Sequence, residues 1–258
     1  MLGAVNDAAT SPIEFRCNLC GTANRAALAA LDRELPTCAS CRSNVRWRAI
    51  GRLVTREVLG VDAVLTELSS HKRIRGVGLS DAHAYAKPLA RKFAYRNTYL
   101  HRWPRLDITA PNFNRYGGVD FIIASDVFEH VPPPVSRAFE NAYRLLRPGG
   151  VLIFTVPFSL DADTLEHFPE LHEWTLTGRD GARVLVNRSA DGRVSRHEGL
   201  VFHGGGGTTL EMRVFSQSGL LREFDQAGFS RVRVCGEPYL PFGIHWPHPC
   251  SLPIAAHR

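Results

Sequence analysis

Residues 119–131 read VDFIIASDVFEHV, and a second block, RLLRPGGVLIFTV, follows at residues 144–156. The first block opens with a nearly unbroken apolar run, which is typical of a strand buried on both faces of a parallel sheet. Between the blocks, apolar residues recur at helical spacing from Val135 to Leu146. Pro148-Gly149-Gly150 then ends the helix before the next apolar run. The two blocks predict a strand, a helix and a second strand in succession.

The same alternation of short apolar strands and helices continues on the N-terminal side of these blocks. It predicts an α/β fold with a Rossmann-like sheet that carries helices on both faces. We expect strands at residues 74–79, 97–101, 105–109, 119–125 and 151–156, and helices at residues 82–93 and 132–146.

A glycine-containing turn ends the strand at 74–79, which suggests a nucleotide-binding site. The dinucleotide fingerprint GxGxxG requires a third glycine, where this chain has Asp81. The carboxylate of Asp81 would repel a pyrophosphate, but it would tolerate a cofactor with an ammonium or sulfonium group. S-adenosylmethionine carries both groups.

Four of the six cysteines form two CxxC pairs with 17 residues between them. Two such knuckles can complete a tetrahedral zinc site. A disulfide pair and a redox CxxC are the alternatives; cytosolic disulfides are rare, and a redox motif needs no second copy. We therefore expect structural zinc in a ribbon at 14–44, with all four coordination positions filled by Cys17, Cys20, Cys38 and Cys41.

The blocks DFIIASDVFEHV at 120–131 and RLLRPGGVL at 144–152 resemble the class I S-adenosylmethionine-dependent methyltransferases of the type 11 group. The resemblance covers roughly residues 72–157 and resumes at 215–234. With the four-cysteine module, the whole chain is similar to bacterial methyltransferases that carry an N-terminal zinc ribbon.

The resemblance implies that S-adenosylmethionine binds along the glycine turn, with the adenine ring flanked by an acid and an apolar residue. In this chain Gly76 replaces the family's acid at the end of the first strand, and we expect Asp81 to supply the missing carboxylate. The family's ribose-binding acid has no clear counterpart between residues 97 and 105. The expected cofactor-binding residues are Gly76, Gly78, Ser80, Asp81, Asp107, Ile108, Ser125 and Asp126.

Two histidines are candidate bases for proton removal from a hydroxyl acceptor, His130 after the central strand and His203 before a tetraglycine stretch. The recurrence of EHV among family members with different substrates favours an alternative for the first, in which Glu129 and His130 fix the loop by hydrogen bonds. The stretch at 204–207 is expected to move or to admit a ligand closely, or to serve only as a connection.

Residues 158–213 interrupt the Rossmann pattern and are expected to build the acceptor pocket, with a lid at 166–174 and a hairpin at 183–195. The aromatic tail at 242–247 is expected to form a final strand and a cap over the pocket. The domain division that follows is a ribbon at 14–44, connecting helices at 45–71 and a methyltransferase domain at 72–258.

The net charge of +6 is concentrated in part at residues 72–105, which hold nine Lys and Arg residues against one acid. An arginine-rich amphipathic helix at 45–59 is expected to pack the ribbon onto the next domain, or to contact RNA. The leading expectation is methyl transfer to a small polar molecule or a glycan. An RNA acceptor and a non-catalytic zinc-ribbon binding module are the alternatives.

The longest apolar run, at 151–156, is too short to span a membrane, so no membrane partner is expected. The first residues carry no basic stretch that leads into an apolar segment, which favours a cytoplasmic protein.

Overall fold

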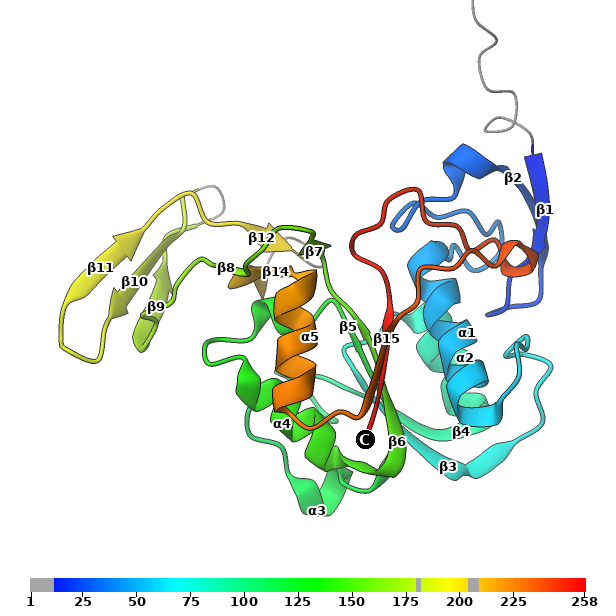
Figure 1. Cartoon of the computed structure of the whole chain (residues 1–258), viewed down its shortest axis with the longest axis horizontal. Helices are drawn as coiled ribbons and strands as arrows, with labels where there is room; N and C mark the ends of the chain where they lie inside the picture. The colour runs from blue at the N-terminus through cyan, green and yellow to red at the C-terminus, as the bar shows by residue number, and fades with distance from the viewer. Residues whose placement is uncertain (1–11, 180–181, 204–208) are drawn as a thin grey trace, which may run out of the picture.

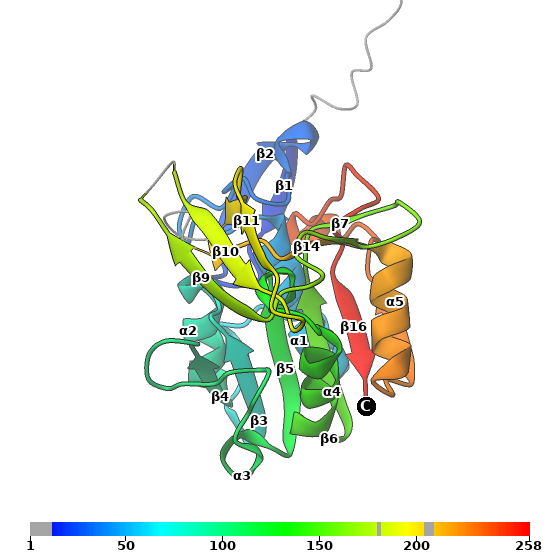
Figure 2. The same ribbon diagram turned by 90° about the vertical axis from the view of Figure 1, so that its left-hand side faces the viewer.

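The structure is a computed structural model that describes residues 12–179, 182–203 and 209–258. Its centre is a six-stranded mixed sheet with the strand order β15-β16-β6-β5-β3-β4. The strands β4, β3, β5 and β6 are parallel to one another (Figure 2), whereas β16 runs antiparallel to β6, and β15 runs antiparallel to β16. The bounds are β3 His71–Leu79, β4 Phe93–Thr98, β5 Val119–Ser125, β6 Leu146–Thr155, β15 Arg231–Val234 and β16 Ile254–His257.

Helices cover both faces of this sheet, as predicted (Figure 1). Helices α1 (Val45–Leu59) and α2 (His83–Lys92) lie on one face, and α4 (Ser136–Leu145) and α5 (Gln217–Gln226) lie on the other. A short helix, α3 (Phe113–Tyr116), precedes β5. The fold is therefore the expected Rossmann-like α/β sheet.

The apolar run of β5 serves both layers because successive side chains of a strand point to opposite faces. Ile122 and Ala124 pack in the core beneath α4 and α5. Phe121 and Ile123 pack in the core beneath α1 and α2. This double burial is the reason that the strand reads as a continuous apolar stretch.

Helix α1 begins and ends with capping residues of the expected kinds. The side chain of Asn44 accepts a hydrogen bond from the backbone N–H of Trp47, and Gly60 ends the helix with a φ of 74°. The helix packs against β5, β6 and α2, so it belongs to a layer of the central sheet as well as to the ribbon.

The N-terminal module consists of the hairpin β1 (Pro12–Arg16) and β2 (Ala23–Ala27), followed by the second cysteine pair. The C-terminal tail packs on this module: Phe242 and Ile244 share a core with Phe15. The prediction of a strand and a pocket cap at 242–247 is wrong, because Leu240–Phe242 is a 3₁₀ turn that ends at Gly243 with a φ of 64°. The last strand of the sheet is instead β16.

Two further strand predictions are also corrected. The strand expected at 97–101 lies earlier, at β4, where Phe93 and Tyr95 provide the alternating buried side chains. Residues 105–109 form no strand and contribute only an isolated bridge between Tyr99 and Arg105.

The insertion forms an arm that extends away from the central sheet (Figure 1). The predicted hairpin is confirmed as β10 (Val184–Arg188) and β11 (Val194–His197), with β9 (Glu173–Thr177) on the other side of β10. Short strands connect the arm to the body: β7 Phe158–Ser159, β8 Leu165–Glu166, β12 Phe202–His203, β13 Thr209–Leu210 and β14 Arg213–Ser216. Among the described residues, no helix is long and apolar enough to cross a membrane.

Candidate active site

A cavity of about 1120 Å³ opens at the carboxyl ends of β3 and β5. The register pairs Leu79 with both Ala124 and Thr98, so these strand ends meet at one edge of the sheet. Open α/β sheets bind ligands at this edge. Its volume lies just above the ~300–1,000 Å³ that is typical of small-molecule sites, so the cavity is a large one of this kind.

Five of the eight predicted cofactor residues line this cavity, namely Ser80, Asp107, Ile108, Ser125 and Asp126. The other three do not. Gly76 packs against the ring of Phe121, which leaves no room for a β-carbon. Gly78 likewise leaves room for the Asp81 carboxyl group and the Tyr95 hydroxyl.

The Asp81 side chain lies beneath the strand end and is buried. Its carboxyl oxygens accept hydrogen bonds from the hydroxyls of Tyr85 and Tyr95, and its backbone N–H donates to Asn97 Oδ1 at 2.9 Å. Burial raises the pKa of Asp81 to about 7, although both tyrosine hydrogen bonds act in the opposite direction. Both carboxyl oxygens of Asp81 thus have hydrogen-bond partners within the protein, and the group does not line the cavity.

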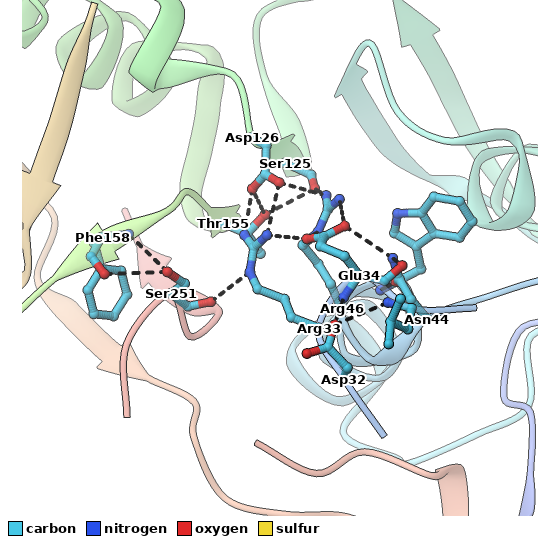
Figure 3. A network of polar contacts seen from close by, with 12 residues as sticks. Asp32, Arg33, Glu34, Asn44, Arg46, Ser125, Asp126, Thr155, Phe158 and Ser251 are labelled. Atoms are coloured by element: carbon cyan, nitrogen blue, oxygen red, sulfur yellow. Dashed lines mark hydrogen bonds and ion pairs between the residues drawn. The ribbon is translucent and has the colours of Figure 1, made fainter. Parts of the chain in front are cut away.

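Asp126 binds two arginines from the N-terminal part of the chain (Figure 3). Arg33, from the loop between the cysteine pairs, contacts Asp126 Oδ1 at 2.7 Å, and Arg46 of α1 contacts Oδ2 at 3.2 Å. Thr155 also donates to Asp126 Oδ1, at 2.9 Å. Burial favours the neutral acid, but the two guanidinium groups outweigh it and hold the pKa of Asp126 below its usual range.

Three charged residues that the sequence does not mark as cavity residues also line the cavity, namely Arg33, Glu34 and Arg46. Arg33 is separated from Asp126 by 93 positions. No local pattern signals such a pairing. The only available signal was the location of Arg33 between the two CxxC pairs of a folded module.

Glu129 is nearly inaccessible to solvent, and it lines the cavity. Neither carboxyl oxygen has a hydrogen-bond partner among the described residues, and Oε1 lies 3.8 Å from His130 Nε2. Burial, reinforced by the charge of Asp126, raises the pKa of Glu129 well above its usual range. The expected loop-fixing hydrogen bond of Glu129 is therefore made by its backbone, whose carbonyl accepts from Met212 N at 2.8 Å.

The two candidate bases face each other across the cavity wall. The rings of His130 and His203 are 5.7 Å apart between centroids, in an edge-to-face arrangement. His130 Nδ1 is 2.8 Å from the carbonyl oxygen of Leu210, so Nδ1 carries the proton and Nε2 presents its lone pair. Burial lowers the pKa of His130.

His203 is oriented by a carboxylate, since its Nε2 lies 3.3 Å from Glu211 Oε2. The other oxygen of Glu211 lies 2.9 Å from His167 Nε2. The stretch at 204–207, which is expected to move or to admit a ligand closely, or to serve only as a connection, lies outside the described residues.

The rest of the insertion contributes little to the cavity. Of its described residues, only His203 and Thr209 are among those that line the wall. The segment expected to form a lid, 166–174, does not reach the cavity and instead supplies Phe168 to the core of the arm.

The four cysteines of the CxxC pairs are clustered, with their Sγ atoms all within 4.8 Å of one another. Cys17 is 3.6 Å from Cys41, and Cys20 is 3.6 Å from Cys38. Zn–S bonds of ~2.3 Å in a tetrahedron place sulfur atoms ~3.8 Å apart, so the cluster fits a zinc ion.

A family model described as a methyltransferase domain matches residues 52–234. None of the curated protein sequences matches the chain significantly. The fold is similar to that of the Burkholderia thailandensis 1,6-didemethyltoxoflavin N1-methyltransferase, with 14% identity over 82% of this chain and 77% of that chain and a TM-score of 0.46. It is also similar to an amino pentose methyltransferase from Micromonospora echinaspora, with 14% identity over 84% and 93% of the two chains and a TM-score of 0.45. At this similarity, neither structure identifies the substrate of this chain.

Proposed function

The chain belongs to the methyltransferase-domain family, and from this we propose that its cavity holds S-adenosylmethionine beside a small polar or sugar acceptor. The observation that carries the proposal is the shared wall: Ser80, Asp107 and Ile108 line the same cavity as the paired imidazoles of His130 and His203. One cavity thus offers a cofactor edge and a base.

The chemistry of the wall fits a cofactor that carries a positive charge. Glu129 is a buried carboxyl group without a hydrogen-bond partner among the described residues, and it lines the cavity. Such a group is costly to leave unsatisfied, and a bound ammonium or sulfonium group would provide the missing partner. We assign to Glu129 the cation-binding role that the sequence suggested for Asp81.

The cofactor supplies an activated methyl group, and the protein has to align the acceptor and accept its proton. His130 Nε2 is suited to take that proton, because Nδ1 is already bound to the Leu210 carbonyl and the lowered pKa keeps the ring neutral near pH 7. Glu211 holds His203 beside it and can stabilise the cation that forms if His203 takes the proton.

The alternative of an RNA acceptor gains no support from the basic strip at 72–105. Several of its cations bind the chain's own carbonyl groups: Lys72 binds that of Phe93, Lys92 that of Leu68 and Arg105 that of Leu100. These contacts leave fewer charges for phosphate groups. The cytoplasmic location and the zinc ion stay predictions.

The cofactor edge is tested by replacing Asp107 with Ala. Asp107 Oδ1 accepts hydrogen bonds from the backbone N–H and the hydroxyl of Thr109, at 2.9 and 2.7 Å, and so fixes the segment beside Ile108. We expect the affinity for S-adenosylhomocysteine, measured by calorimetry, to fall by about 1–3 kcal/mol. Unchanged affinity in the variant would place the adenine elsewhere, and no binding to the wild-type protein would overturn the proposal.

A further inference from the structure

The wall of the cavity nearest to the ribbon contains two arginines whose side chains are mostly buried. Arg33 and Arg46 are 16% and 13% exposed, and both contact Asp126 at the end of β5 (Figure 3). Arg46 also donates to Ser125 Oγ at 2.6 Å. Each guanidinium group is thus fixed on one side by the central sheet.

Glu34 binds the same two arginines from the other side. Arg46 donates to its carboxylate through both Nε and a terminal nitrogen, at 2.8 and 2.7 Å, in a two-pronged pair. Arg33 contacts the same carboxylate. Glu34 is 49% exposed, so it is the outermost member of a cluster whose cations are buried.

The two carboxylates of the cluster are held to different degrees. Asp126 is fixed by the hydroxyl of Thr155 and by its own backbone N–H, which donates to the Thr155 carbonyl at 2.7 Å. Apart from the arginines, the Glu34 carboxylate has a single further contact within the part of the chain that the structure describes, a long one of 3.3 Å from Asn44 Nδ2. A rotation of the Glu34 side chain would leave two guanidinium groups against one carboxylate, with one positive charge directed at the cavity.

A guanidinium fork matches the geometry of carboxylate and phosphate groups, and binds them through paired, charge-assisted hydrogen bonds. We propose that Arg33 and Arg46 form an oxyanion site, at which a carboxylate or phosphate group of a bound ligand displaces Glu34. Glu34 occupies the site when no ligand is bound and competes with the ligand for it.

Two ligands of the proposed function could bring such a group. One is the cofactor, through the carboxylate of its amino-acid part, and the other is an acceptor that carries a carboxylate or phosphate. The identity of the ligand rests on the proposed function, whereas the oxyanion site itself does not.

The test uses the full chain with Glu34→Gln, which removes the competing charge. Calorimetric titrations are made with inorganic phosphate in the presence of saturating S-adenosylhomocysteine, with S-adenosylhomocysteine alone, and with 5′-methylthioadenosine, which lacks the amino-acid part. Glu67→Gln is the matched control, because Glu67 pairs with Arg16 at an exposed position outside the cavity.

If an acceptor uses the site, Glu34→Gln binds phosphate about tenfold more tightly than the wild-type protein, while its affinity for S-adenosylhomocysteine is unchanged. If the cofactor uses the site, the same variant binds S-adenosylhomocysteine about tenfold more tightly and 5′-methylthioadenosine as before. In either case Arg46→Lys, which keeps the charge but loses the fork, cancels the gain in the double variant.

The proposal is overturned if Glu34→Gln increases the affinity for neither phosphate nor S-adenosylhomocysteine, or if Glu67→Gln increases it equally. If phosphate binding tightens but neither adenosine compound binds to any variant, the oxyanion site stands and the proposed function fails.

Discussion

The buried Asp81 carboxyl group keeps its proton to a higher pH in the folded protein, since its pKa of about 7 lies far above the value of 3.8 that an exposed aspartate has. The unfolded chain releases this proton at lower pH than the folded chain does. The contribution of Asp81 to stability is therefore complete below about pH 4, declines as the pH rises, and is lost above about pH 7.

Replacing Asp81 with Asn should remove this dependence, because the amide stays neutral and can still bond to the hydroxyls of Tyr85 and Tyr95. Between pH 5 and pH 8, the wild-type protein should lose on the order of 2 kcal/mol more unfolding free energy than Asp81→Asn. Urea unfolding at both pH values measures the difference. Asp161→Asn, at an exposed position, is the control, and equal losses in all three proteins would contradict the prediction.

The paired imidazoles give a second prediction at the scale of single residues. Replacing the histidine that acts as base with Ala should lower turnover roughly 100- to 10,000-fold, with the affinity for S-adenosylhomocysteine nearly unchanged. His172→Ala is the control, because His172 is exposed and lies outside the cavity wall. Near-normal turnover in His130→Ala, His203→Ala and the double variant would mean that alignment alone drives the reaction.

Among single residues, the sequence predicted positions at strand ends better than the directions of side chains. Ser125 and Asp126 line the cavity because a strand end in an α/β sheet has a fixed place. Asp81 does not line the cavity, because Ser80 turns the chain with a φ of 60°. A serine in the sequence does not predict this uncommon backbone conformation. The contacts of Arg33 and Glu34 depend on how the ribbon packs, which no local pattern contains.

At the scale of elements, the ribbon is attached to the body through apolar cores that it shares with the sheet and with the C-terminal tail, and through the buried cation of Arg48. The Arg48 side chain of α1 is fully buried and donates to the carbonyl oxygens of Ser43 and Gly243, at 2.8 and 2.7 Å. It thereby joins the second cysteine knuckle to the C-terminal tail. The position of the ribbon is what brings Arg33 to Asp126.

Cys38→Ser should release the metal and loosen the ribbon, since metal binding supplies folding free energy to so small a module. We expect about one zinc per chain in the wild-type protein, and loss of zinc together with a lower melting temperature in the variant. Elemental analysis and thermal unfolding measure both effects. Cys250→Ser serves as the control, because Cys250 lies outside the cluster, and zinc-free wild-type protein purified without chelator would refute the prediction.

Elements whose apolar residues recur at a regular spacing were predicted well, whereas elements whose structure depends on contacts distant in the sequence were not. The buried strand β5 and the hairpin of β10 and β11 follow directly from their patterns. The tail at 242–247 resembles a strand in composition, but it packs on Phe15, far away in the sequence. The prediction that residues 158–213 build the acceptor pocket failed for the same reason, because most of this insertion forms an arm with a core of its own.

At the scale of the whole molecule, the cavity is assembled from three parts of the chain. The ribbon side supplies Arg33, the central sheet supplies Ser125, and the insertion supplies His203. A ligand in the cavity contacts all three parts, of which the ribbon and the sheet share an apolar core, whereas the outer arm has a core of its own. Binding should therefore stabilise the cavity wall and leave the outer arm as it is.

Hydrogen exchange followed by mass spectrometry can test this expectation. Saturating S-adenosylhomocysteine should slow exchange at residues 79–82, 106–109 and 125–127, which form the cofactor edge. Exchange at β10 and β11 should stay the same, because none of their residues lines the cavity. Protection confined to the arm would show that the ligand binds elsewhere.

The strand order also determines when this part of the sheet can pair during synthesis. Strand β16 lies between β6 and β15, yet it is translated after both of them. Until it emerges from the ribosome, β6 and β15 each expose an edge with unpaired backbone groups, which is the kind of surface through which nascent chains aggregate. Pairing of this part of the sheet must wait for residues 254–257, and a chaperone that shields these edges would help most in that interval.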